Sequence, residues 1–154
     1  MEELNNPESE VFKNTLEKQK KFITERLKTI KNKYLDDGFI VAPQKKEKIV
    51  RHLNNGIAAN TIQTFFNYKT DTCIICKGIK GDNGIRQIER AHCNNYSRSD
   101  ILHLAVSEII EKLDNGEIVT VGEILKKFIE KHDCCPIYML CNKCHNKYDK
   151  RCIR

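Results

Sequence analysis

The sequence predicts an α+β protein in which a mostly helical chain encloses one small module held together by cysteines. Apolar residues recur at intervals of three and four along several segments, which is the pattern of amphipathic helices. Two C-x-x-C pairs, Cys73 with Cys76 and Cys141 with Cys144, stand far apart in the chain, and a compact module would bring them together. At 154 residues the chain suits one domain of ordinary size, or a helical region fused to a compact module.

We expect the first part of the chain to contain one long helix. Between Val11 and Tyr34 apolar side chains recur at threes and fours, with Lys, Glu and Thr between them. Gln19 interrupts the apolar stripe, and Asp36-Asp37-Gly38 ends the helix. A helix packed on its own domain explains the pattern better than a dimerising coiled coil, because about three heptads is the shortest run that supports a coiled coil.

A second helical pattern follows a linker that contains Pro43. Residues 45–53 and 57–68 predict two short helices around an Asn54-Asn55-Gly56 turn. The pattern resembles a helix-turn-helix, whose second helix would lie in a DNA groove, but an ordinary αα-hairpin gives the same pattern. In the DNA-binding interpretation, the second helix presents four polar residues to the groove: Asn60, Thr61, Gln63 and Thr64.

Two further helices are predicted in the second half of the chain. The apolar spacing indicates helices over 100–113 and 121–132, and Ser99 or Asp100 can cap the first and Thr120 the second. Asp114-Asn115-Gly116 separates them, followed by a strand-like segment at 117–119.

The positions of these elements suggest two regions. Residues 1–69 form a helical N-terminal region, and residues 70–154 contain both cysteine pairs. The helical stretch at about 94–133 lies between the pairs, so we interpret it as an insertion, where substrate contacts are commonly added.

Charge and hydropathy limit the classes of partner. The chain has 27 Lys and Arg against 21 Asp and Glu, a formal charge of +6 that favours a polyanionic partner, although such charge also serves solubility. No apolar run approaches the roughly 18 residues that span a bilayer, so no membrane association is expected. The polar and acidic segment from Met1 to Glu10 resembles neither a signal nor a transit peptide, which predicts an intracellular protein.

The two C-x-x-C pairs predict one structural zinc ion. Four thiolates, from Cys73, Cys76, Cys141 and Cys144, complete a tetrahedral Zn(II) site and leave no position open for water. A redox dithiol is the alternative, but that motif normally occurs once, at a helix N-terminus in a βαβ context. Four cysteines remain and are expected to be reduced thiols: Cys93, Cys134, Cys135 and Cys152. The alternative is a second metal site that uses some of them together with His132.

Two histidines stand at informative offsets from these pairs. The segment Ile88-Glu-Arg-Ala-His92 follows the first pair after a glycine-containing loop, and Leu140-Cys-Asn-Lys-Cys-His145-Asn-Lys-Tyr-Asp149 carries the second pair. Over roughly residues 70–150 the chain resembles the HNH (ββα-metal) endonuclease family. The resemblance implies a zinc-pinned ββα-metal module in which His92 is the general base and His145, directly after the last cysteine, is a metal ligand.

This chemistry makes physical sense independently of the family. Hydrolysis of a phosphodiester needs an activated water and a cation beside the phosphate, and an imidazole titrates near neutral pH. His145 and Asp149, four residues apart on one helix face, can ligate Mg(II) or Mn(II). Glu89 is expected to orient a ligand or base, and Arg90 to contact phosphate.

Two positions depart from the family pattern. Ala91 stands where the family usually has a metal-ligating Asp or His, and Pro136 stands where its middle Asn would fall. Asn94 or Asn95 is expected to fix the loop instead.

We therefore expect a one-metal endonuclease that cuts double-stranded DNA, of the restriction type or encoded by a phage or virus. It would act in the cytoplasm of a bacterium or of an infected cell. Cutting both strands favours a homodimer with two sites related by a twofold axis. The alternative is a non-catalytic zinc-containing protein that binds nucleic acid.

Overall fold

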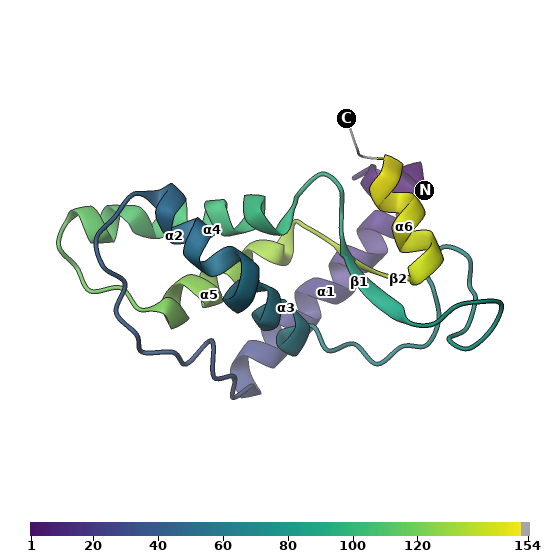
Figure 1. Ribbon diagram of the computed structural model, residues 1–154, viewed down its shortest axis with the longest axis horizontal. Helices are drawn as coiled ribbons and strands as arrows, with labels where there is room; N and C mark the ends of the chain where they lie inside the picture. The colour runs from purple at the N-terminus through teal and green to yellow at the C-terminus, as the bar shows by residue number, and fades with distance from the viewer. Residues whose placement is uncertain (152–154) are drawn as a thin grey trace.

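The structure is a computed structural model and describes residues 1–151 (Figure 1). Within this part of the chain, helices accompany one two-stranded antiparallel sheet, which confirms the predicted α+β class. The elements in chain order are η1 (Glu2–Asn5), α1 (Glu10–Thr29), α2 (Lys46–Leu53), η2 (Asn54–Ala58), α3 (Ala59–Phe65), β1 (Ile88–His92), α4 (Arg98–Asp114), α5 (Val121–Glu130), η3 (Lys131–Asp133), β2 (Ile137–Cys141) and α6 (Asn142–Arg151).

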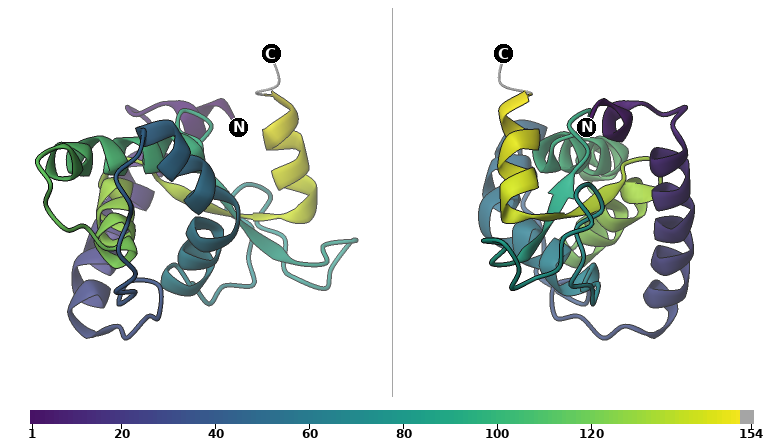
Figure 2. Two further views of the ribbon diagram at one scale, coloured as in Figure 1. Left: turned by 60° about the vertical axis from the view of Figure 1, so that its left-hand side comes forward. Right: turned by 90° about the vertical axis from the view of Figure 1, so that its right-hand side faces the viewer.

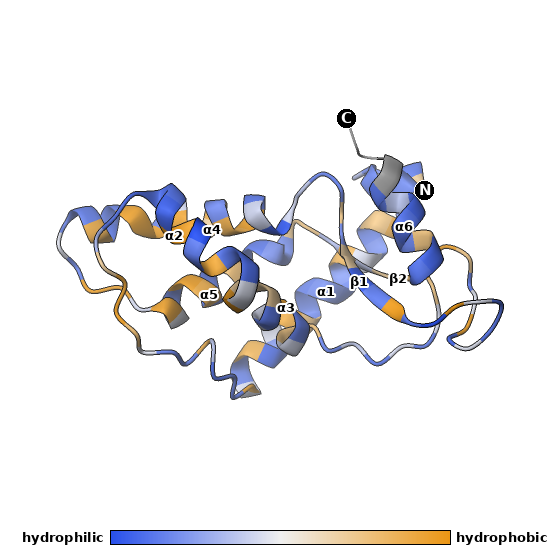
Figure 3. Ribbon diagram, in the orientation of Figure 1, coloured by the Kyte–Doolittle hydropathy of each residue, from blue (hydrophilic) through white to orange (hydrophobic). Residues whose placement is uncertain are grey.

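The larger buried cluster lies among α2, α3, α4 and α5. Leucine, isoleucine and phenylalanine side chains of these helices pack together, and Ile23 of α1 joins them. In Figure 3 the apolar stretches of α4 and α5 contrast with α6, which is largely hydrophilic. The predicted insertion is therefore a main part of the helical body.

A second buried cluster surrounds the two strands. It contains three of the paired cysteines together with Tyr138 of β2 and Tyr148 of α6, and it also contains Leu4 and Phe12 from the start of the chain. The first turns of the chain lie near α6, at the end of the molecule opposite the loop between α4 and α5 (Figures 1 and 2). Because α1 contributes to both clusters, the predicted boundary at residue 69 does not separate them.

The long N-terminal helix is shorter than expected. It begins after Ser9, whose side chain accepts from the Phe12 N–H, and it ends at Thr29, because Ile30 adopts an extended conformation. The segment up to Tyr34 is thus not helical.

Gln19, which interrupts the apolar stripe of this helix, is buried. Its amide is buried, donates to the carbonyls of His132 (2.7 Å) and Cys135 (2.8 Å), and accepts from the Ile137 N–H (2.8 Å). The polar side chain that interrupts the apolar stripe therefore provides hydrogen-bond partners for three backbone groups just before and at the start of β2.

The predicted Asn-Gly turn after α2 is also wrong. Asn54–Ala58 continues the winding as one π-helical turn, and α3 follows directly. Leu53 and Ala58 are both buried, and a wider turn between them keeps both on the core. Tertiary packing has overridden a local turn signal.

The later helices agree with the sequence, and the strand between them does not. Capping boxes begin α4 (Ser97 with Asp100) and α5 (Thr120 with Glu123), so the predicted cap of α5 is confirmed, whereas α4 is capped by Ser97 and not by Ser99 or Asp100. Residues 117–119 form no strand, and Thr120 makes only an isolated bridge to Ile40. No helix within residues 1–151 is both long and apolar enough to cross a membrane.

Candidate active site and metal centre

The strand pairing sets the geometry of the candidate site. β1 and β2 pair antiparallel, with Ile88 opposite Cys141 and His92 opposite Ile137. Since α6 begins immediately after Cys141, it starts beside the first residue of β1. Two strands and a helix are thus joined in the expected order, but the strands are linked through the helical body and not by a tight hairpin.

The four paired cysteines meet at the start of this unit, as predicted. The sulfur atoms of Cys73, Cys76, Cys141 and Cys144 all lie within 4.8 Å of one another. Cys76 and Cys141 are 3.9 Å apart, far beyond the length of about 2.0 Å of a disulfide bond. The cluster can hold a metal ion such as zinc.

Local backbone structure aims these sulfur atoms inward. Cys76 Sγ accepts from the Gly78 N–H (3.4 Å), and Cys141 Sγ accepts from the Cys144 N–H (3.3 Å). Lys77 has a positive φ of 61°, which turns the chain tightly. A Cβ at Gly78 would lie 2.4 Å from Cδ1 of Ile85, so the end of the Ile85 side chain would have to move to admit it.

The thiols of the cluster differ in pKa, and burial raises that of Cys144. Burial alone would raise the pKa of Cys73, yet hydrogen bonds from the backbone of Cys141, Cys76 and Ile75 lower it to about 7. A thiolate is the form that binds a metal ion.

The remaining cysteines are separate from this cluster. Cys134 and Cys135 have their sulfur atoms 3.5 Å apart, and Cys93 donates to the Leu4 carbonyl. None of them belongs to a metal-ligating group of three or more among the described residues, so the alternative second site with His132 is not found there. Cys152 lies outside the described residues.

His145 lies between two carboxylates. Its Nδ1 is 3.1 Å from Oε1 of Glu89 on β1, and its Nε2 is 3.3 Å from Oδ2 of Asp149, one turn further along α6. Gln87 donates to the other oxygen of Glu89 (2.6 Å) and steadies it. The structure therefore brings together three of the residues selected from the sequence.

His92 contacts the helical body. Its Nε2 lies 3.2 Å from Nε2 of His132, a fully buried side chain in η3. Burial, together with the positive charge of Arg98, lowers the pKa of His92 to about 4. The ring is therefore neutral at pH 7.

One cavity joins these groups. A hollow of about 280 Å³ at the end of β1 is lined by Arg90, His92, His145 and Asp149, together with Ala91, Cys93, Asn94, Tyr96 and Ser97. His92 is the last residue of β1, and His145 and Asp149 of α6 line the same cavity. Arg90 Nη1 donates to the Phe66 carbonyl (3.4 Å), so this guanidinium bridges the cavity and the helical body.

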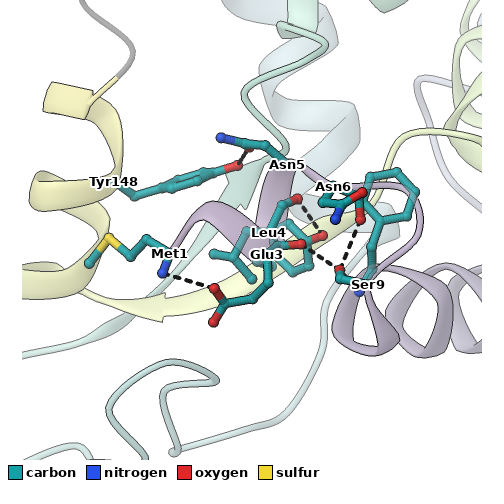
Figure 4. A network of polar contacts seen from close by, with 9 residues as sticks. Met1, Glu3, Leu4, Asn5, Asn6, Ser9 and Tyr148 are labelled. Carbon is teal, nitrogen blue, oxygen red and sulfur yellow. Dashed lines mark hydrogen bonds and ion pairs between the residues drawn. The ribbon is translucent and has the colours of Figure 1, made fainter.

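The start of the chain holds α6 in place. Tyr148 of α6 donates to Oδ1 of Asn5 (Figure 4) and accepts from the Asn94 N–H (2.8 Å). The Asn94 amide donates to the Tyr148 carbonyl (3.2 Å), and Asn95 donates to the Asn5 carbonyl (2.8 Å). Asn94 thus ties the segment after β1 to α6, while Pro136 accepts from the Cys93 N–H (3.0 Å) and extends the strand pairing.

The four residues proposed to read DNA do not share one exposed face. Asn60, Gln63 and Thr64 are exposed, but Thr61 is fully buried and its hydroxyl donates to the Ile57 carbonyl (2.7 Å). Thr61 therefore cannot reach a groove, because it lies on the core side of α3.

A larger hollow of about 820 Å³ lies elsewhere, between α1, residues 68–77 and β2. None of the described residues that line it is a histidine or a carboxylate, and Cys73, whose thiol titrates near neutral pH, belongs to the four-cysteine cluster. The smaller cavity is the better candidate site.

Comparison of the chain with protein-family models, with curated proteins and with solved structures gave no match. The function is therefore argued from the site itself. The sequence singled out His132 only as an alternative metal ligand, and it gave no sign of the Asn5–Tyr148 contact. His132 stands only two positions before the vicinal cysteines, and nothing local distinguishes it from a metal ligand.

Proposed function

We propose that this protein is a divalent-metal-dependent endonuclease of the HNH (ββα-metal) type that acts on double-stranded DNA. The observation that carries the proposal is the shared cavity: His92, His145 and Asp149 line one hollow at the end of a strand pair whose other end holds four cysteines. A base and a cation site beside one space are the minimum for phosphodiester hydrolysis.

Zinc fits the cysteine cluster as a structural ion. Sulfur atoms bound at about 2.3 Å to a tetrahedral zinc ion lie about 3.8 Å from one another. The 3.9 Å between Cys76 and Cys141 matches this edge. Because four thiolates leave no open position, the ion would clamp the 73–76 turn to the end of β2 and the start of α6 and would take no part in the reaction.

The contacts of His145 suit a divalent cation. If Nδ1–H donates to Glu89, the lone pair of Nε2 is free beside the carboxylate of Asp149. An imidazole nitrogen and a carboxylate oxygen would then hold Mg(II) or Mn(II), with Glu89 orienting the ring from behind. When bound, such a cation stabilises charge on the phosphate and on the leaving oxygen.

His92 would accept the proton of the attacking water. Its neutral ring has a lone pair at pH 7, and the cavity gives a water molecule access to it. Arg90 has further guanidinium N–H groups beyond the one that contacts Phe66, and these can bind a phosphate oxygen.

The net charge of +6 favours DNA as the polyanion, and cleavage of both strands favours a homodimer. A restriction-type enzyme, or one encoded by a phage or virus, fits the small size of the chain.

The test is digestion of linear double-stranded DNA in Mg(II) or Mn(II). His92→Ala should reduce the cleavage rate about a hundredfold or more without loss of bound zinc or DNA affinity. His52→Ala is the matched control, because His52 is exposed and lies on α2, outside the cavity. Cleavage by His92→Ala at the wild-type rate would sink the assignment of the base.

A second candidate function is a non-catalytic module that binds nucleic acid. The basic charge and the four-cysteine cluster favour it equally. It predicts salt-sensitive DNA binding with no cleavage in either cation.

A further inference from the structure

The environment of His132 determines where its proton lies. Its Nδ1 is 2.8 Å from the carbonyl oxygen of Phe128, which can only accept a hydrogen bond, so Nδ1 carries the hydrogen. Burial, with the neighbouring His92 as a second cause, lowers the pKa of His132 to about 3. The ring is neutral and holds one proton, and Nε2 is therefore a bare acceptor.

This acceptor faces His92. Two Nε2 atoms 3.2 Å apart form a hydrogen bond only if one of them carries the hydrogen, and His132 has none to give. The hydrogen is thus on Nε2 of His92. In a neutral imidazole the lone pair is then on Nδ1.

His132 is itself held rigidly. Its ring lies against Phe66 and Phe128, at centroid distances of 5.3 Å and 5.0 Å, and its backbone carbonyl accepts from Gln19. No rotation is available that would turn Nδ1 toward His92 without breaking the bond to Phe128. The acceptor in front of His92 is therefore preorganised.

We propose that His132 is the positioning residue for the general base: it fixes the Nε2–H tautomer of His92 and leaves Nδ1 as the atom that accepts the proton of water. This inference rests on the proposed nuclease function. In a Ser-His-Asp triad a buried carboxylate orients the catalytic histidine. Here a neutral histidine, held by a hydrogen bond to the backbone, takes that role.

The proton balance of the step is complete. An O–H bond of water breaks and its proton moves to Nδ1, while the oxygen forms a bond to phosphorus and the bond from phosphorus to the leaving sugar oxygen breaks. The leaving oxygen takes a proton from solvent. His92, now an imidazolium, keeps its Nε2–H directed at His132, whose lone pair stabilises the new charge, and Nδ1 later returns its proton to solvent.

Two substitutions separate positioning from packing. His132→Phe keeps an aromatic ring in the core but removes the acceptor. His132→Gln keeps an acceptor, because its amide oxygen can lie close to the position of Nε2. If His132 only filled space in the core, His132→Gln would show no more of the wild-type tautomer and activity than His132→Phe.

The first measurement is the tautomer of His92, from long-range ¹H–¹⁵N correlations of the imidazoles in the folded, zinc-loaded protein. Wild type and His132→Gln should show Nε2 protonated, and His132→Phe should show a mixture or the Nδ1–H form. A wild-type His92 protonated on Nδ1 would overturn the inference. This readout does not depend on cleavage.

The second measurement is DNA cleavage by the same proteins. His132→Phe should lower kcat at least about tenfold with little change in KM or thermal midpoint, and His132→Gln should recover most of the loss. An unchanged kcat in His132→Phe overturns the positioning role while the nuclease assignment stands. If wild type shows the Nε2–H tautomer but cleaves no DNA, the proposed function fails and with it the catalytic role of His132.

Discussion

Oε1 of Glu89 lies 3.1 Å from Nδ1 of His145, and this contact joins β1 to α6 beside the cavity that His145 lines. Both side chains are partly buried, with 31% and 24% of their surfaces exposed. The contact therefore orients a ring whose other nitrogen faces Asp149.

Glu89→Ala should weaken cation binding more than chemistry. Loss of the carboxylate frees the imidazole of His145 to rotate, so the Mg(II) or Mn(II) concentration for half-maximal cleavage should rise roughly 10- to 100-fold. Metal titration of the cleavage rate measures this. Glu17→Ala on the exposed face of α1 is the control. An unchanged titration in Glu89→Ala would show that Glu89 does not support a ligand.

Removal of one paired cysteine should abolish metal binding. Cys141→Ser changes a buried sulfur in the four-cysteine cluster, whereas Cys134→Ser changes an exposed sulfur outside it. Metal analysis should find one zinc per chain in wild type and Cys134→Ser and none in Cys141→Ser, whose thermal midpoint should also fall. Full zinc content in Cys141→Ser would contradict the site.

Acid should destabilise the fold before ordinary carboxylates titrate. Burial holds the pKa of His92 at about 4 and that of His132 at about 3, below the ordinary value of 6.5. The positive charge of Arg98 opposes protonation of His92. The other titratable side chains that line the cavity with His92 include His145 and Asp149. Between the lowered pKa values and pH 6.5, the unfolded chain therefore binds more protons than the folded protein. The stability that the neutral histidines contribute is present above pH 6.5 and is lost as the pH falls.

At pH 5 each of the two histidines should lower the free energy of unfolding by roughly 2 kcal/mol relative to pH 7.5. Urea unfolding at both pH values measures the loss, which His132→Phe should reduce. A free energy that is flat from pH 7.5 to 5 would contradict the burial of neutral histidines.

Gln19→Ala should be strongly destabilising for a single change on a surface helix. It leaves the carbonyls of His132 and Cys135 and the N–H of Ile137 without their partner, at a cost of about 3 kcal/mol. Asn14→Ala, which changes an exposed residue five positions earlier on α1, is the matched control. Equal urea midpoints for the two variants would show that water replaces the amide.

The sequence alone determined the features that depend on local spacing. The two tight turns of the C-x-x-C pairs predicted the four-cysteine cluster, and apolar periodicity with the Thr120 cap predicted the later helices. The offsets of His145 and Asp149 placed them one helical turn apart, which the structure confirms. These features need only a few neighbouring residues, because turn geometry and helical pitch are short-range properties.

Only the tertiary structure decided which distant residues meet. Gln19 is paired with backbone 113 to 118 positions away, and His92 with a histidine 40 positions away. Thr61 was expected in a groove and is in the core, and Asn54–Ala58 continues a helix where a turn was expected. Each outcome depends on packing between elements. A single local preference favours one backbone conformation by only a fraction of a kcal/mol, and the free energy gained by burying apolar side chains is larger.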